Sequence, residues 1–95
     1  MTNVNTVYSH SPHIITRKTG TEYVLVPVAN NIADMNSVYT LNESGAFIWE
    51  LIDGKRNVGE IIDRVTEEYD IDHDSAAQDV LFLINDMSNY LIINI

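Results

Sequence analysis

The most constraining feature of this sequence is a short apolar segment that needs cover on nearly all sides. It begins at Asn42 and ends at Asp53-Gly54, where glycine takes the left-handed conformation after a helix at little cost. Its apolar residues, which include the only tryptophan of the chain, are Ala46, Phe47, Ile48, Trp49, Leu51 and Ile52. A helix that is apolar around most of its circumference lies inside a protein. We therefore expect this helix to form the centre of the core.

The length of 95 residues is that of one domain. Residues 1–12 are polar and without periodicity, so we expect a flexible N-terminal arm followed by a single domain over residues 13–95. The arm lacks the pattern of a signal peptide, and no apolar run reaches the ~18 residues of a membrane span. Cysteine is absent, which excludes disulfides and thiolate metal sites and fits a cytoplasmic protein.

The charge balance limits the partners that the chain can bind. Fourteen acidic residues against five basic ones give a net charge of −9. Phosphate contacts need lysine and arginine, so this balance argues against nucleic acid and against an anionic membrane surface. A basic or neutral partner is easier to accommodate.

Three short β-strands are expected before the apolar helix. Their β-branched and aromatic residues predict antiparallel strands at 14–17, 22–28 and 35–41. Gly20 supplies the hairpin turn between the first two, and residues 29–34 are expected to form a polar turn. In the third strand Tyr39 and Leu41 share one face, while Val38 and Thr40 share the other.

Two more helices and a terminal strand are expected after Gly54. Asn57 and Glu60 form a candidate capping box for a helix that ends near Tyr69. The third helix is predicted over 75–89, capped by Asp74 or by Ser75, the latter with Gln78. The apolar residues 90–95 predict a strand that lies as a wing beside the helices or pairs with the sheet.

The third helix carries one aromatic residue on its polar side. Its expected buried stripe consists of Ala76, Ala77, Val80, Leu83, Ile84 and Met87. Phe82 lies nearly opposite the centre of that stripe. Two interpretations stay open, a single exposed apolar residue, which is common, and a contact point for a partner.

No group of residues in the sequence predicts catalysis, a metal site or a cofactor. The aspartates of residues 70–74 resemble the start of a calcium loop, but Ser75 and Leu81 occupy the positions of its glycine and its bidentate acid. The histidines lack ligand spacing; they are His10, His13 and His73. We therefore expect a protein that is not an enzyme and that acts through a binding surface, with an extended peptide pairing to an open strand edge.

The apolar helix and its surroundings resemble the PqqD family. The resemblance covers about residues 14–95. It is carried by the motif Leu41-Asn42-x-Ser44-Gly45-Ala46-x-Ile48-Trp49-x-Leu51-Ile52-Asp53-Gly54, then Val58-Gly59-Glu60-Ile61, Tyr69, and Asp79-Val80-x-x-Leu83. It implies an α+β fold of the winged helix-turn-helix type, in which a three-stranded antiparallel sheet precedes three helices and a short C-terminal strand.

Members of this family bind the leader segment of a ribosomally made precursor peptide and deliver it to a modifying enzyme, often a radical S-adenosylmethionine enzyme. The resemblance implies no catalytic activity and no cofactor. By position, it implies peptide contacts on the third strand and along the third helix, at Ser37, Val38, Tyr39, Thr40, Asp79, Val80, Leu83, Asp86 and Met87. Phe82 remains a possible partner contact.

One consequence and two rival functions follow. Acidic residues along the expected groove, Asp79 and Asp86, favour a leader that carries lysine or arginine. One rival is a winged-helix DNA-binding regulator, which needs a basic helix face that the chain does not supply. The other is a dimerisation module that uses the terminal strand or Phe82, so both a monomer and a homodimer are open.

Overall fold

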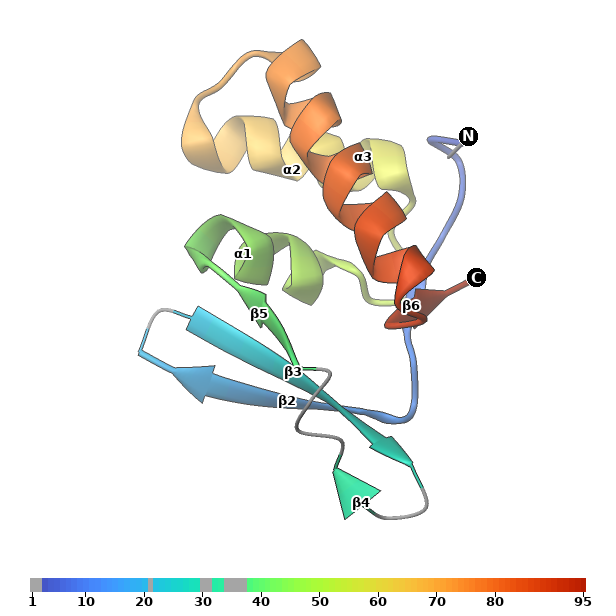
Figure 1. Cartoon of the computed structure of the whole chain (residues 1–95). Helices are drawn as coiled ribbons and strands as arrows, with labels where there is room; N and C mark the ends of the chain where they lie inside the picture. The colour runs from blue at the N-terminus through green and yellow to red at the C-terminus, as the bar shows by residue number, and fades with distance from the viewer. Residues whose placement is uncertain (1–2, 21, 30–31, 34–37) are drawn as a thin grey trace.

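The computed structural model describes residues 3–20, 22–29, 32–33 and 38–95. Its strands are β1 (Ser9–His10), β2 (Ile14–Thr19), β3 (Glu22–Ala29), β4 (Ile32–Ala33), β5 (Tyr39–Leu41) and β6 (Ile93–Asn94). Its helices are α1 (Glu43–Leu51), α2 (Val58–Tyr69) and α3 (His73–Asn89). Figure 1 shows the sheet on one side of α1 and the pair α2–α3 on the other.

The main sheet confirms the predicted antiparallel α+β arrangement. β3 is central: β2 pairs with one of its edges, and both β4 and β5 pair with the other. Two details differ from the prediction. Ile32 and Ala33 pair with the end of β3 although they were expected in a turn, and within the described part of the third strand only residues 39–41 pair. The predicted strand residues 35–37 lie outside the described part of the chain.

α1 forms the centre of the core, as its sequence predicts. Its buried side chains, together with Ile52 just beyond it, pack against Leu25 and Leu41 of the sheet and against both other helices. Asn42 begins the helix because its Oδ1 accepts a hydrogen bond from the Gly45 N–H at 2.9 Å. Phe47, which the sequence also assigned to this apolar helix, is only half-buried, and its ring meets the ring of Tyr69 edge to face.

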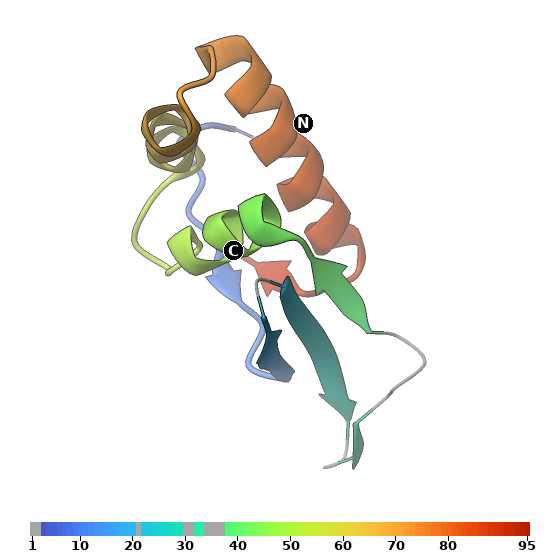
Figure 2. The same cartoon turned by 90° about the vertical axis from the view of Figure 1, so that its left-hand side faces the viewer.

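α2 and α3 pack against each other above α1 (Figure 1), and they cross steeply, since Figure 2 shows α2 nearly end-on while α3 runs along the plane of the picture. The predicted capping box at Asn57 and Glu60 is present. The predicted start of α3 was wrong by two residues, because Asp72 caps the helix and accepts from the Ser75 N–H. Ser75 Oγ also donates to Asp72 at 2.9 Å, so this serine reinforces the cap and does not form its own.

The first described residues run along the surface and pair with the end of the chain. β1 pairs antiparallel with β6, so the terminal strand joins this segment and not the main sheet. The carbonyls of Val4, Thr6 and Tyr8 accept hydrogen bonds from the backbone N–H groups of the α1–α2 turn and the start of α2. The His10 ring stacks on Trp49 at 3.5 Å, and its Nε2 lies 2.8 Å from the Trp49 carbonyl. The sequence did not predict these contacts of residues 3–11.

A substitution at His10 tests how strongly this segment is bound. We expect His10→Ala to lower the free energy of unfolding by about 1–2 kcal/mol, because it removes both the stacking and the hydrogen bond. The matched control is His13→Ala, because His13 is exposed like His10 but its ring makes no stacking contact or hydrogen bond with the described residues. Urea unfolding measures both variants, and equal losses would contradict a bound N-terminal segment.

Candidate functional site

The outer edge of β5 is the first part of the candidate site. Val28 donates its N–H to His13, and Pro27 has no N–H to donate. Backbone N–H and C=O groups alternate in direction along a strand. The N–H and C=O groups of Val24 and Val26 therefore point toward β2, while those of Tyr23 and Leu25 point toward β5. The register therefore makes hydrogen-bonded pairs of Leu25 with Tyr39 and of Tyr23 with Leu41.

The backbone N–H and C=O of Thr40 point the opposite way from those of Tyr39 and Leu41. It is the non-hydrogen-bonded partner of Val24, so its N–H and C=O point away from β3. Among the described residues no strand pairs with this side of β5. Val38, two residues earlier, is exposed. Within the described part of the chain, the sheet thus offers an unpaired donor and an unpaired acceptor at Thr40.

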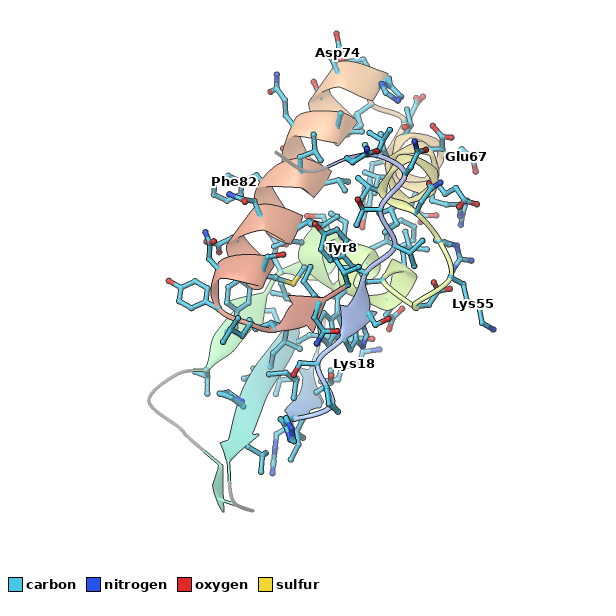
Figure 3. The ribbon with its side chains drawn as sticks, turned by 90° about the vertical axis from the view of Figure 1, so that its right-hand side faces the viewer. Tyr8, Lys18, Lys55, Glu67, Asp74 and Phe82 are labelled. Atoms are coloured by element: carbon cyan, nitrogen blue, oxygen red, sulfur yellow. The ribbon has the colours of Figure 1, made fainter. Side chains whose placement is uncertain are left out.

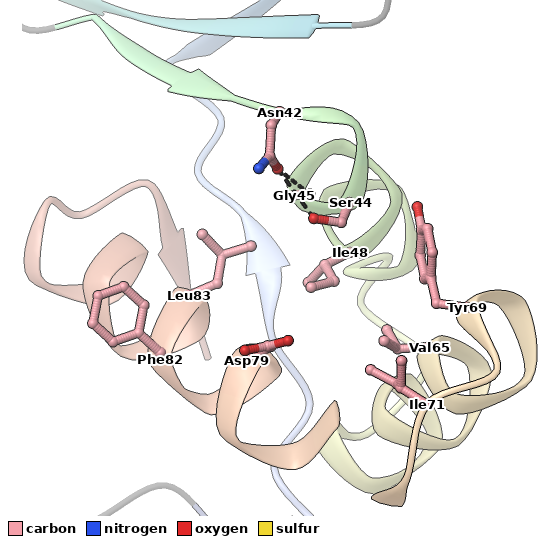
Figure 4. A pocket seen from close by; sticks show the side chains of 10 residues that line it. All are labelled: Asn42, Ser44, Gly45, Ile48, Val65, Tyr69, Ile71, Asp79, Phe82 and Leu83. Carbon is pink, nitrogen blue, oxygen red and sulfur yellow. Dashed lines mark hydrogen bonds between the residues drawn. The ribbon is translucent and has the colours of Figure 1, made fainter. Parts of the chain in front are cut away.

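A pocket of about 400 Å³ opens where β5 passes into α1. We call it the α1–α3 pocket. Its lining residues come from the start of α1, the end of α2 and the middle of α3; they are Asn42, Ser44, Gly45, Ile48, Val65, Tyr69, Ile71, Asp79, Phe82 and Leu83 (Figure 4). Most of these side chains are apolar. Among the described residues that line it, Asp79 alone carries a formal charge, and none is a lysine or an arginine.

At its other end β5 is tied to α3 by a polar contact. The Tyr39 hydroxyl donates to Asp86 Oδ2 at 2.5 Å, and the Tyr39 ring meets Tyr90 edge to face. Burial, together with the hydrogen bond to the Asp86 carboxylate, raises the pKa of Tyr39 above its ordinary value. The hydroxyl therefore remains a donor throughout the neutral pH range.

The structure separates the residues that the sequence assigned to peptide contact. Thr40 of β5 and Val38 just before the strand are exposed, while Tyr39 turns toward α3. On α3, Leu83 is half-exposed and Asp79 exposed, and both line the pocket. Ser37 lies outside the described residues.

Three further residues that were expected to contact the peptide or a partner differ in exposure. Val80 and Met87 are fully buried with 0% exposure, so their side chains support the core and we do not retain them as peptide contacts. Phe82 is 74% exposed. It lines the outer margin of the pocket, and Figure 3 shows it on the side of α3 that faces away from the core.

Sequence reasoning missed the other walls of the pocket. Asn42, Ile48, Tyr69 and Ile71 were assigned to caps, core or connections. They come together only because α2 ends over the start of α1, and no periodic pattern signals that meeting. Within the described residues, no cluster of three or more metal-ligating side chains is placed to hold an ion. No helix of that part of the chain is long and apolar enough to cross a membrane.

The comparisons with known proteins agree with this architecture. Among solved structures, the chain resembles one described as "TbiB1 in Complex with the TbiA(beta) Leader Peptide", with a TM-score of 0.76 and 20% sequence identity. The match covers 90% of this chain and 94% of that one. At this identity the match establishes the fold. No curated protein matches the sequence.

The fold is thus that of a small α+β domain with an open-edged sheet against three helices. The family model of "Coenzyme PQQ synthesis protein D (PqqD)" matches residues 22–93, which is most of the chain. The protein belongs to the PqqD family, and this confirms the resemblance seen in its sequence.

A double-mutant cycle tests the tie between β5 and α3. We expect Tyr39→Phe and Asp86→Ala each to lower the free energy of unfolding, with a coupling of about 1–2 kcal/mol, because the hydrogen bond involves a carboxylate. Urea unfolding of the wild type, both single variants and the double variant gives the coupling. Additive losses would show that the two side chains do not interact.

Proposed function

We propose that this protein binds the leader segment of a ribosomally synthesised precursor peptide by strand addition to the outer edge of β5. The bound leader lies between that edge and α3, with one side chain in the α1–α3 pocket. The protein then presents the peptide to an enzyme that modifies it, such as a radical S-adenosylmethionine enzyme, and itself performs no chemistry. Binding and presentation of the peptide take place in the cytoplasm.

The observation that carries the proposal is the outward N–H and C=O of Thr40, which no described strand pairs with, beside an apolar pocket. Backbone pairing supplies affinity in strand addition, and adjoining pockets read the side chains. Membership of the PqqD family supports the same function. So does the neighbouring solved structure, whose description names a bound leader peptide.

Charge argues for a peptide and against DNA. The five basic residues are Arg17, Lys18, Lys55, Arg56 and Arg64. Arg56 pairs with Asp53 and Arg64 with Glu67, and none of the five lies on α3. A helix that enters a DNA groove needs cationic side chains for the phosphates.

A proline at position 40 tests the role of the backbone. Peptides are first selected on the wild-type protein from a displayed random dodecapeptide library. We expect Thr40→Pro to weaken their binding up to about tenfold, because it removes the outward N–H that the peptide would use. Proline is tolerated on edge strands when its missing N–H faces solvent, so the variant is expected to fold.

The matched control is Thr40→Val, which keeps the N–H and the β-branched shape. It is expected to bind as the wild type does. Peptides methylated at single backbone nitrogens repeat the test without altering the protein. Equal binding by Thr40→Pro and Thr40→Val, with no methylation site that matters, would refute strand addition at β5. Failure of the wild type to enrich any peptide would count against peptide binding itself.

A further inference from the structure

The position of Asp86 at one end of β5 suggests a rule for the peptide's side chains. Asp86 is half-buried on α3, and among the described residues its carboxylate accepts a hydrogen bond only from the neutral Tyr39 hydroxyl. No cationic side chain of the described residues forms an ion pair with it. A carboxylate partly withdrawn from water without a cationic partner gains more from an incoming cation than a fully exposed one does.

The sheet register determines which peptide side chains reach this carboxylate. Residues directly opposite one another on neighbouring strands project from the same face. Tyr39 and Leu41 project toward the helices, whereas Thr40 is exposed. A peptide paired with Thr40 therefore points the residues opposite Tyr39 and Leu41 toward α3, and these two positions, i and i+2, have one residue between them.

The surroundings of β5 differ in chemistry between its two ends. The end at Tyr39 meets Asp86 and Tyr90, whereas the end at Leu41 opens into the apolar α1–α3 pocket. Asp79 at the pocket and Asp86 are two helical turns apart, about 10 Å. Peptide residues i and i+2 lie about 7 Å apart along an extended strand, so side chains of one short strand extend toward both ends.

We infer that Asp86 reads a lysine or arginine of the bound peptide, two residues away from an apolar side chain that enters the α1–α3 pocket. The inference rests on the proposed function, since it concerns the same peptide. Its partner is thus a short extended peptide with a basic residue and an apolar residue on one face. The positive charge also matches the net charge of −9 of the chain.

Selection on the wild type and on Asp86→Asn tests the inference. The asparagine oxygen can still accept the Tyr39 hydrogen bond, so the substitution removes charge and keeps the tie. The library is the same displayed random dodecapeptide library. We expect wild-type selections to enrich lysine or arginine two positions from a large apolar residue, and Asp86→Asn selections to lose that excess.

Binding measurements with individual peptides give the size of the charge effect. In an enriched peptide, replacing the basic residue by norleucine keeps the stem and removes the charge. We expect about three- to tenfold weaker binding to the wild type, little change in binding to Asp86→Asn, and a smaller effect at high salt. The control Asp74→Asn removes an exposed charge from the first turn of α3 and is expected to behave as the wild type.

The outcomes separate this inference from the proposed function. Enrichment of apolar residues without a basic excess would overturn the inference, and so would a basic excess that survives in Asp86→Asn. In either case a loss of binding by Thr40→Pro would leave strand addition intact. Peptides that bind Thr40→Pro and the wild type equally would overturn both.

Discussion

The site depends on the direct joint between β5 and α1. Leu41 is buried in the core, Asn42 caps the helix, and no linker separates the two elements. α1 is in turn enclosed by the sheet and by α2 and α3. Because the strand leads straight into the central helix, its outer edge cannot move away from α3 without disturbing the core.

The other end of β5 is held by a polar contact where packing is less complete. Tyr39 is half-buried, and its hydroxyl bonds to Asp86 on α3. Together the buried joint and this hydrogen bond hold a very short edge strand, whose inner side already pairs with β3. Short edge strands limit aggregation because they offer few open groups. Here the open groups at Thr40 lie between helix and sheet, where side-chain contacts can select what pairs with them.

The sequence predicted those parts of the fold that local pattern determines. The apolar run of α1, the β-branched run of β3 and the capping box of α2 each carry a signal within a few residues. Distant contacts were missed. β1 exists because Ser9 and His10 meet residues 93–94, and a two-residue pairing has no period to detect. The start of α3 was misplaced because several neighbouring residues are competent caps, and packing decides among them.

The candidate site was predictable in outline and not in detail. An open edge on the third strand followed from the order of strands and helices, and Leu83 and Asp79 do line the pocket beside it. Val80 and Met87 were assigned to the rim by family position, although the helical pattern already placed them in the buried stripe. Both have 0% exposure, so the physical pattern was the better guide. The remaining pocket walls depend on how three helices meet, which no single segment encodes.

Strand addition at β5 depends on one backbone amide group, that of Thr40. Amide hydrogen exchange measured by NMR, without and with a selected peptide, tests it directly. In the free protein we predict fast exchange at Thr40 and slower exchange at Leu41, whose N–H points toward β3. With the peptide bound, Thr40 should become protected. Protection of Thr40 in the free protein, or unchanged fast exchange in the complex, would contradict the account.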